Sequence, residues 1–349
     1  MFPTLNVGSV TQARAPRLRS AAMPESPHQA RVAVVCGGPA AEREVSLTSG
    51  REVAAALRAS FDDVTVHEPD LQLAVELMGG AIDVVFPALH GPLGEDGSIQ
   101  GMFEVAGVPY VGSGVAASAC AMDKVIAKRL FREAGLPLAR EVVIERPDAG
   151  GAAASVRASL PGRVAVKPAT QGSALGVAFA ETDDQLEAAL EDAFRYDEKV
   201  LVEEYVVGSE ITVGILESPE PQAFPVIDIR TPGDSWYDFE HRYEVGLSEH
   251  VIPAPLPPDL YASIQDLAVR AHATLGCRDL SRVDFVVEPS GRIALLEVNT
   301  LPGMTPTSLY PDGAQAAGIS FEELVEQLVR RALSRAPARD EARTAPPAA

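Results

Sequence analysis

The sequence predicts an α/β protein that is α+β in part, and three observations support this. In the N-terminal third, short apolar runs alternate with helical stretches, which is typical of a parallel sheet with helices on its faces. Short strands with one helix among them follow, which favours a small α+β unit. A pair of apolar strands lies near the C-terminus. The 349 residues are enough for two or three domains of ordinary size.

The N-terminal region contains two runs that predict buried strands, Arg31–Cys36 and Ile82–Phe86. Between them, apolar residues at helical spacing predict a helix with one face toward the sheet. The glycine pair Gly37-Gly38 follows the first strand, and the loop His90-Gly91 follows the second. Ligands of open parallel sheets bind beyond the carboxyl ends of the strands, so these two loops are candidate binding sites.

The middle of the chain predicts a helix over Asp123–Ala134 that ends at Gly135. Its expected apolar stripe consists of Val125, Ile126, Arg129 and Leu130. A second helix opens with Thr182 and Gln185 as a capping box. Short strands surround this second helix and are expected at Glu141–Ile144, Arg163–Pro168, Gly176–Ala180 and Val200–Glu203.

The last third of the chain predicts a larger mixed unit. A helix over about 260–275 is stopped by Gly276, and a closing helix opens with Ser320 and Glu323 as a capping box. A loop over 231–246 is rich in glycine, aspartate and aromatic residues. Strands are expected at Glu210–Leu216, Phe224–Ile229, Arg282–Val287 and Arg292–Val298.

The last two of these strands bring polar side chains onto one patch. Side chains alternate faces along a strand, so Arg282 and Asp284 share a face, as do Glu297 and Asn299. A two-residue turn at Ser290-Gly291 would place Asp284 opposite Glu297, and Arg282 opposite Asn299. A slightly longer turn would shift this pairing while preserving the shared face.

The side-chain oxygens of Asp284, Glu297 and Asn299 form a candidate site for a divalent cation. Hard oxygen ligands in this number suit Mg²⁺, which prefers to share its shell with phosphate oxygens and water. The following turn, Pro302-Gly303, permits close approach of the backbone to a ligand. The alternative is a solvated hairpin face with ordinary cross-strand ion pairs, and the pattern alone leaves both interpretations open.

The charge balance excludes some classes of partner. Lysine and arginine number 29 against 49 acidic residues, which gives a formal charge of −20. Such a surface repels phosphate backbones and anionic membranes, so neither nucleic acid nor a membrane is an expected partner. ATP remains compatible, because local cations and a metal can reverse the field inside a cleft. The sequence has no run of 18 apolar residues, so no membrane-spanning helix is expected.

The cysteines and the chain ends complete the expectations from composition. Cys36, Cys120 and Cys277 lie among apolar residues and are expected to be reduced, with the cytoplasm as the location. Residues 1–30 have arginines but no apolar signal segment, which predicts a disordered leader in which Met1 or Met23 is the start. Residues 334–349 are rich in alanine, proline and charge, which predicts a disordered tail.

Five stretches of the sequence occur in one characteristic order. They are GGPAAEREVSLTSG at 37–50, ALHGPLGEDGSIQGMFEVAGVPYVGSG at 88–114, MDKVIAKRL at 122–130, VKPATQGSALGV at 166–177, and the hairpin through MTPTSL at 304–309. In this order they resemble the D-alanine–D-alanine ligase family, which has the ATP-grasp fold. The resemblance implies three domains, over 31–122, 123–208 and 209–333. The first has a parallel sheet, and ATP lies between the central and the C-terminal catalytic domains.

The resemblance also implies contacts to nucleotide and metal. Lys124 and Lys167 match the lysines that contact ATP phosphates, and the loop 171–173 matches the flexible lid above them. Asp284, Glu297 and Asn299, called the hairpin triad, match the ligands of Mg²⁺ or Mn²⁺, with two ions expected. The stretch 202–206 matches the hinge that holds adenine through backbone groups. The remaining implied nucleotide contacts are Glu203, Glu204, Val206, Glu210 and Arg242.

The implied reaction forms an acyl phosphate from one D-alanine and ATP, which the amine of a second D-alanine then attacks. Arg282 and the backbone N–H of Gly303 match the oxyanion hole, and Glu42 matches the carboxylate that holds the first ammonium. His90 matches a contact of the first substrate, and Ser308 and Leu309 match the pocket for the second. Ser173 and Tyr243 match the hydroxyls that hydrogen-bond with Glu42 and close the lid.

Some positions depart from the family pattern, and rival functions are also considered. Arg242 stands where a lysine is usual, and Ala174 and Ala40 replace frequent serines. These changes bear on rate and substrate rather than on reaction class. The rivals are a D-lactate- or D-serine-adding relative, another ATP-grasp ligase or carboxylase, and a nucleotide-binding protein without catalysis. Tyr243 favours peptide formation, and the family implies a homodimer.

Overall fold

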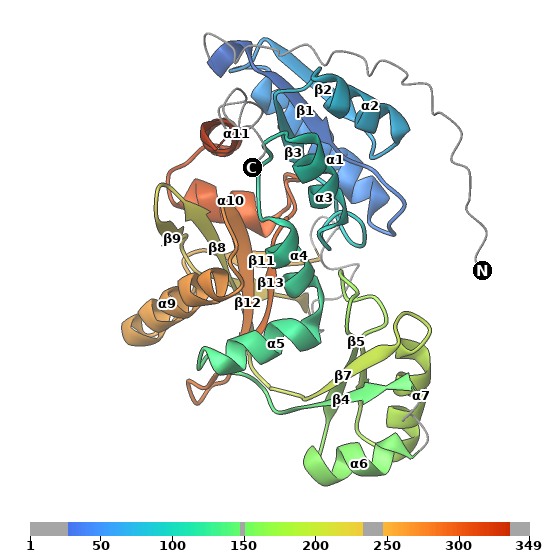
Figure 1. Cartoon of the computed structure of the whole chain (residues 1–349). Coiled ribbons are helices and arrows are strands. Elements are labelled where there is room, and N and C mark those ends of the chain that lie inside the picture. Colours follow the sequence, from blue (N-terminus) through green and yellow to red (C-terminus); the bar gives the residue numbers. More distant parts are fainter. Residues whose placement is uncertain (1–26, 147–150, 233–246, 336–349) are drawn as a thin grey trace, which may run out of the picture.

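The computed structural model describes residues 27–146, 151–232 and 247–335. Within these ranges the strands form three sheets with helices packed on them (Figure 1), which confirms the predicted mixed α/β class. Arg242 and Tyr243 of the predicted site lie outside the described residues, as do residues 1–26 and 336–349.

The first sheet is parallel throughout, as predicted, with the order β2-β1-β3. Its middle strand, β1, is nearly fully buried. The edge strand β2 was not predicted from the sequence, because most of its side chains are exposed and no apolar run marks it. The elements of this region are β1 (Arg31–Val35), α1 (Arg43–Leu57), β2 (Asp63–His67), α2 (Leu71–Gly79), β3 (Val84–Pro87) and α3 (Ser98–Ala106).

The loops after β1 and β3 meet at the carboxyl edge of this sheet. The backbone N–H of Gly37 donates to Ser46 Oγ at 2.8 Å, and that hydroxyl donates to the carbonyl of Ala88 at 2.7 Å. Gly37 has a φ of +86°, a conformation that L side chains rarely adopt. The buried Ser46 therefore ties the two predicted candidate loops together.

The second sheet is antiparallel with the order β4-β7-β5-β6, and two helices pack against one of its faces. Thr182 and Gln185 form the predicted capping box at the start of α7. The elements are β4 (Glu141–Glu145), α6 (Ala152–Ser159), β5 (Val164–Pro168), β6 (Ala178–Ala180), α7 (Asp183–Ala193) and β7 (Lys199–Glu204).

The third sheet has the path β11-β10-β8-β12-β13, with β9 paired to β8. Helices α5 and α9 share one apolar core with its central strands. The strands are β8 (Ser209–Glu217), β9 (Pro221–Ala223), β10 (Ile227–Arg230), β11 (Glu249–Val251), β12 (Leu280–Val287) and β13 (Ile293–Asn299). The helices are α4 (Val115–Met122), α5 (Lys124–Glu133), α9 (Pro258–Thr274), α10 (Leu309–Ala316) and α11 (Phe321–Ser334).

The β12–β13 hairpin has the predicted register at its functional end. Arg282 pairs with Asn299, and Asp284 pairs with Glu297. The predicted two-residue turn is wrong, however, because the N–H of Glu288 bonds the carbonyl of Arg292 at 2.9 Å and leaves three residues in the turn. A register shift just after Asp284 compensates for the extra residue. The predicted pairing of the polar side chains is therefore restored.

Helix α5 buries only part of the predicted stripe. Val125 is buried and Leu130 is half-buried, as predicted, but Ile126 and Arg129 are exposed, and Lys128 and Phe131 are fully buried instead. The prediction was wrong for Ile126 and Arg129 because α5 turns Lys128 inward, where its Nζ lies 2.6 Å from Glu203 Oε1 on β7. A distant acidic partner thus determines which face of the helix is buried.

Ordered structure also extends beyond the predicted limits at both ends. Residues 27–30, assigned above to the leader, include a 3₁₀ turn, and His28 Nδ1 lies 2.6 Å from the carbonyl of Ser60. Ser334 and Arg335, assigned to the tail, end helix α11 and cap it. Arg335 is ordered because its guanidinium bonds the carbonyl of Tyr110 at 2.9 Å and the carboxylate of Asp279.

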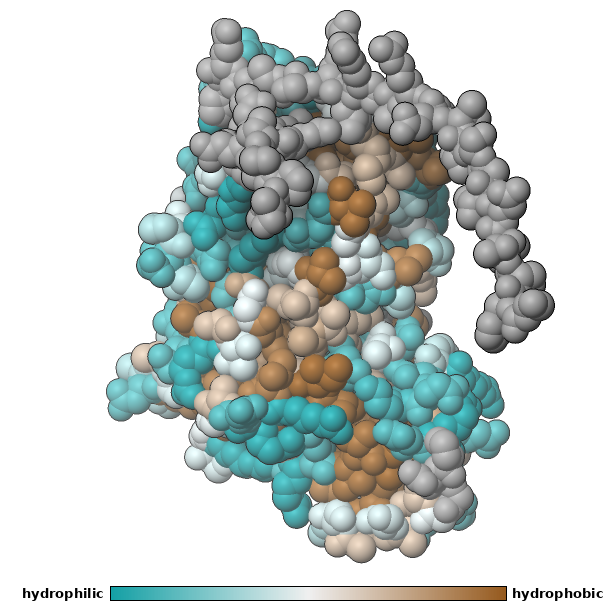
Figure 2. Space-filling model, in the orientation of Figure 1, coloured by the Kyte–Doolittle hydropathy of each residue, from teal (hydrophilic) through white to brown (hydrophobic). Residues whose placement is uncertain are grey.

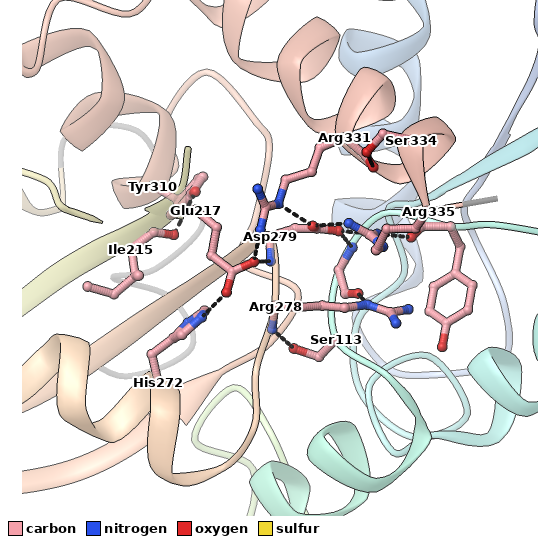
Figure 3. A network of polar contacts seen from close by, with 12 residues as sticks. Ser113, Ile215, Glu217, His272, Arg278, Asp279, Tyr310, Arg331, Ser334 and Arg335 are labelled. Atoms are coloured by element: carbon pink, nitrogen blue, oxygen red, sulfur yellow. Dashed lines mark hydrogen bonds and ion pairs between the residues drawn. The ribbon is translucent and has the colours of Figure 1, made fainter. Parts of the chain in front are cut away.

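A buried ionic cluster around Asp279 joins the third sheet to the first (Figure 3). Asp279 directly precedes β12 and is fully buried. Its carboxylate accepts hydrogen bonds from the N–H of Gly112 at 2.8 Å, from Arg331 Nε at 3.0 Å and from Arg335 Nη2 at 2.7 Å. Arg278 Nε donates to the carbonyl of Gly112 at 2.7 Å. Since residue 110 pairs with β3, this cluster holds β3 against β12.

The face of the described residues shown in Figure 2 combines hydrophilic areas with apolar patches over its middle and lower parts. Among the described helices, none has the length and apolar character needed to cross a membrane.

Candidate active site

Two adjoining cavities lie where the three sheets meet. The first, called the polar cavity, is lined by His90, Glu95, Arg282, Asn299, Gly303 and Ser308, among others. The second, called the apolar cavity, is lined by Ala165, Val177, Phe179, Val206, Val286 and Leu296, among others. Both share one wall, which consists of Lys124, Gln171, Gly172, Ser173 and Glu297. Residues separated by more than 200 positions in the chain thus face one connected space.

Lys124 connects the lid to the hairpin within the shared wall. It is the first residue of α5, whose N-cap Asp123 accepts the N–H groups of the next turn. Lys124 Nζ donates to the carbonyl of Gln171 at 2.5 Å and lies 3.5 Å from Glu297 Oε2. A single ammonium therefore reaches both the lid loop and a predicted metal ligand.

Lys167, the other predicted phosphate lysine, belongs to a buried ion triad. Glu203 lies between Lys128 Nζ at 2.6 Å and Lys167 Nζ at 2.7 Å. Burial by itself would raise the pKa of Glu203, but the two ammonium groups outweigh it and hold the pKa at about 2. Burial would likewise lower the pKa of Lys167, yet Glu203 makes the net shift upward. Sequence reasoning missed Lys128, whose only signal was a helical position four residues after Lys124.

The apolar cavity has the character of a site for a flat aromatic ring. Strands β5 and β6 supply Ala165 and Phe179 to its lining, and β12 and β13 supply Val286 and Leu296. Nothing local distinguishes these four residues in the sequence, because each has the character of an ordinary inward-facing strand residue. The predicted hinge and ribose residues Glu203, Glu204, Val206 and Glu210 line the same cavity.

The side chain of Glu204 is held away from a direct role by two arginines. It accepts Arg140 Nε at 2.8 Å and the backbone N–H of Arg140 at 3.0 Å, and it also bonds Arg292. Although burial would raise its pKa, these donors hold the pKa of Glu204 at about 2. Because its carboxylate already binds these two arginines, we expect the backbone of residues 202–206, rather than this side chain, to contact a ligand.

The hairpin triad fits a divalent cation that also binds phosphate oxygens. Among the described residues there is no group of three or more His, Cys, Asp or Glu side chains that could hold a metal. The hairpin instead offers two carboxylates and the Asn299 amide, whose oxygen also accepts the N–H of Leu301 at 3.1 Å. Mg²⁺ characteristically takes one or two carboxylates and completes its shell with substrate phosphates and water. The donor set is therefore suitable for Mg²⁺ together with a nucleotide.

Arg282 and Asp284 form a bidentate ion pair on β12. The guanidinium donates through Nε at 2.9 Å and through Nη2 at 2.7 Å, and Thr212 Oγ1 donates to the same carboxylate at 2.6 Å. This pairing fixes the plane of the guanidinium, which lines the polar cavity. The predicted oxyanion donor is thus oriented by a predicted metal ligand.

Glu42 is buried between the lid and the loop after β3. It is 2% exposed, and its Oε2 has no hydrogen-bond partner among the described residues. A Cβ added to Gly91 would lie 2.8 Å from that oxygen, and one added to Gly172 would lie 3.3 Å from Oε1. An unsatisfied buried carboxylate oxygen is costly, which suits a group that awaits a cationic ligand.

The lid itself carries backbone strain. Ser173 and Ala174 have φ values of +46° and +59°, in the left-handed region that non-glycine residues rarely enter. Strain of this kind concentrates at ligand clamps and switch regions. Ser173 lines both cavities, so the strained backbone forms part of the shared wall.

His90 is a neutral side chain in the wall of the polar cavity. Burial lowers the pKa of its imidazole to about 4, and the positive charge of Arg282 adds to the effect. Its Nε2 lies 3.4 Å from Ser49 Oγ, and that hydroxyl accepts the N–H of Met304 at 3.3 Å. His90 is therefore held in contact with the turn that carries Gly303.

Gly303 and Ser308 lie side by side at the other end of the polar cavity. A Cβ added to Gly303 would lie 2.7 Å from Ser308 Oγ, so only glycine fits without displacement. Ser308 Oγ accepts the N–H of Thr305 at 3.0 Å. Ser308 precedes α10 and Leu309 is its first residue, so the N-terminus of this helix faces the cavity.

Glu95 is a cavity residue that sequence reasoning missed. Its Oε2 accepts the N–H of Gly91 at 2.6 Å, and its side chain lines the polar cavity. The signal was two adjacent acids within the GEDG segment of the second matching stretch. The neighbouring Asp96 accepts the N–H groups of Leu93 and Ser98, so the two acids have different roles.

Together the fold and the cavities define an ATP-grasp enzyme, in which an apolar cavity between the second and third sheets adjoins a polar one. Two family models match the chain, D-ala D-ala ligase N-terminus over residues 62–113 and D-ala D-ala ligase C-terminus over residues 130–330. The chain therefore belongs to the D-alanine–D-alanine ligase family, as the sequence motifs predicted.

Individual relatives agree with this assignment. The chain is 47% identical to the D-alanine–D-alanine ligase of Desulforudis audaxviator, over 87% of this chain and 99% of the relative. It is 43% identical to that of Halalkalibacterium halodurans, over 87% and 100%.

Solved structures with the same fold include VanG D-Ala:D-Ser ligase from Enterococcus faecalis, with a TM-score of 0.75 and 30% identity over 87% of this chain and 99% of the other. The D-alanine–D-alanine ligase from Coxiella burnetii has a TM-score of 0.75 and 25% identity over 88% and 95%.

Proposed function

We propose that this chain joins two D-alanine molecules to D-alanyl-D-alanine, with conversion of ATP to ADP and phosphate and a D-alanyl phosphate intermediate. The product supplies peptidoglycan precursor synthesis in the cytoplasm, where ATP is available. The observation that carries the proposal is the shared wall, because Lys124, Glu297 and the lid face both an apolar cavity and a polar cavity.

In the first step, a D-alanine carboxylate attacks the γ-phosphate of ATP. Glu42 holds the ammonium of this substrate, and His90 contacts it as a neutral imidazole. Lys124 and Lys167 balance the phosphate charge, which is the main requirement of phosphoryl transfer. Asp284, Glu297 and Asn299 would hold Mg²⁺ or Mn²⁺, two ions with the nucleotide, and the metal charge would stabilise the phosphates.

In the second step, the amine of another D-alanine attacks the acyl phosphate. Arg282 and the N–H of Gly303 stabilise the oxyanion. Removal of one such donor costs on the order of 3 kcal/mol of transition-state stabilisation. Ser308 and Leu309, at the N-terminus of α10, hold the second carboxylate, which the helix dipole favours. We propose that Ser173 acts with Tyr243 in closing the lid and that Arg242 serves the γ-phosphate, although Arg242 and Tyr243 lie outside the described residues.

A D-serine- or D-lactate-adding enzyme is the nearest alternative. Two D-alanine–D-alanine ligases, those of Desulforudis audaxviator and Halalkalibacterium halodurans, are 47% and 43% identical to this chain, against 30% for the D-Ala:D-Ser ligase. The Coxiella burnetii ligase, at 25%, is less similar than either, so identity supports the D-alanine assignment through the first two relatives. The test is phosphate release and product analysis with D-alanine, D-serine, D-lactate and L-alanine. We expect D-alanyl-D-alanine as the main product; a preference for D-serine or D-lactate, or ATP consumption without D-alanine, would overturn the proposal.

We further propose that the domains divide as predicted, over 31–122, 123–208 and 209–333, and that the chain forms a homodimer. Leu71, Val75 and Met78 form an exposed apolar stripe on α2, with Leu71 80% exposed. Such a stripe suits a self-complementary interface. Light scattering should give twice the chain mass, and Val75→Asp should give a monomer. A monomeric wild type would reject the homodimer.

A further inference from the structure

The polar cavity contains one carboxylate to which the reaction above gives no role. Both amino-acid substrates bring an ammonium group, and Glu42 serves the first. Among the described residues that line the polar cavity, the carboxylates are Glu95 and Glu297. Glu297 belongs to the hairpin triad, so Glu95 is the carboxylate available to the second ammonium.

The backbone around Glu95 is rigid, which gives its side chain a fixed starting point. Asp96 caps the N–H groups of Leu93 and Ser98, both at 2.9 Å. Gln100 Nε2 donates to the carbonyl of Gly94 at 2.8 Å. The bond from the N–H of Gly91 then orients one carboxylate oxygen. Glu95 is partly exposed, and it lines the cavity that also contains Arg282, Gly303 and Ser308.

The electrostatic surroundings of Glu95 allow it to exchange a proton near neutral pH. Burial raises the pKa of its carboxyl to about 8, and the charges of Glu42 and Glu297 act in the same direction. The Gly91 N–H and Arg282 oppose this rise. The other charged or titratable groups of the cavity are Lys124 and the neutral His90. The matched acidity is what a proton acceptor for an amine requires.

We propose that Glu95 binds the ammonium of the second D-alanine and accepts one proton from it. The proposal rests on the ligase function above. The ammonium gives a proton to the Glu95 carboxylate, and the freed lone pair forms the carbon–nitrogen bond at the acyl phosphate carbonyl. The carbon–oxygen bond to phosphate then breaks with its electron pair on phosphate. The second amine proton leaves with the phosphate, and Glu95 returns its proton to solvent.

The test uses Glu95→Gln, which keeps the side-chain size and an acceptor oxygen for the Gly91 N–H. Dipeptide formation is compared with trapping of D-alanyl phosphate by hydroxylamine, which is uncharged at neutral pH, so that no proton has to be removed before its nitrogen attacks. We expect the variant to lose dipeptide kcat by about 100-fold or more, because general-base contributions are of this size. Hydroxamate formation should stay within a few-fold of wild type. Asp96→Asn, the matched control, should keep both activities because asparagine also caps.

Three results would decide the matter. Dipeptide formation by Glu95→Gln within threefold of wild type would overturn the proposal. Equal loss of dipeptide and hydroxamate in the folded variant would also overturn it, since Glu95 would then act in the first step or in substrate placement generally. Failure of the wild type to form hydroxamate from ATP and D-alanine would instead reject the proposed function itself. In the pH profile, the rise of dipeptide kcat/KM near pH 8 should disappear in Glu95→Gln.

Discussion

Two buried acidic regions of this molecule contain the same chemical groups but differ in how these groups are satisfied. Asp279 is fully buried and receives two arginine side chains and a backbone N–H (Figure 3). In the wall of the polar cavity, Glu95 accepts a hydrogen bond from the backbone N–H of Gly91, and the nearby buried Glu42 keeps an oxygen without a hydrogen-bond partner among the described residues. The first region is complete without a ligand, whereas the second has free hydrogen-bonding capacity.

This difference separates stability from function. A buried carboxylate with fixed cationic partners is strongly destabilising to break, because its partners are left charged and buried. A buried carboxylate with unused acceptor sites carries a desolvation cost that a ligand can remove. We therefore expect changes at Asp279 to affect unfolding, and changes at the cavity carboxylates to affect catalysis.

The largest expected effect is the loss of activity in Glu297→Ala. This change removes a carboxylate from the shared wall and should reduce the ligation rate on the order of 10³-fold, as for other charge-stabilising groups in phosphoryl transfer. Ligation is measured by phosphate release at saturating Mg²⁺. Substantial remaining activity would contradict the metal assignment. Glu288→Ala, on the same hairpin and paired with Arg292, should retain activity.

Asp279→Asn should have the opposite effect to Glu297→Ala, with a large loss of folding stability and a preserved ligation rate. Asparagine tolerates the φ of +63° at this position but removes the charge that pairs Arg331 and Arg335. We expect a loss of roughly 3 kcal/mol in unfolding free energy, measured by urea titration. Asp266→Asn, at an exposed α9 ion pair, should change it by less than about 0.5 kcal/mol. A stable but inactive Asp279→Asn would break the comparison.

Ser308→Ala should have the smallest effect. Its hydroxyl is expected to bind the second carboxylate equally in ground and transition states, so KM for the second D-alanine should rise with little change in kcat. A loss of about 1 kcal/mol of binding free energy, the contribution of one hydrogen bond, corresponds to roughly a fivefold rise in KM. Initial rates over a range of D-alanine concentrations measure this. A fall in kcat with unchanged KM would move Ser308 from binding to the chemical step.

The hairpin shows what the sequence could predict. Alternation along a strand is local, so the shared faces of Arg282 with Asp284 and of Glu297 with Asn299 followed directly. The exact pairing was right although the turn was wrong, because the shift after Asp284 offsets the longer turn. Local patterns could not reveal such a compensation.

Residues that depend on distant partners could not be found in this way. Lys128 resembles any helix-surface lysine until Glu203 and the carbonyl of Leu295, 167 positions away, approach it. The role of Asp279 likewise depends on distant partners, because α11 and the segment between α3 and α4 must meet the start of β12. Glu95 was hidden by a different cause, since it lies beside Asp96 and nothing local distinguishes a cavity acid from a capping acid.

The most direct test of the account is the urea-unfolding midpoint of Glu95→Gln against wild type at pH 9, without substrates. The folded pKa of about 8 exceeds the ordinary value of 4.5, so ionisation costs stability progressively as pH rises from 4.5 to 8. Glutamine has no charge to bury, so the variant should have the higher midpoint at pH 9 and a similar midpoint near pH 4.5. A lower midpoint at pH 9 would show that Glu95 stabilises the fold, which would contradict the account.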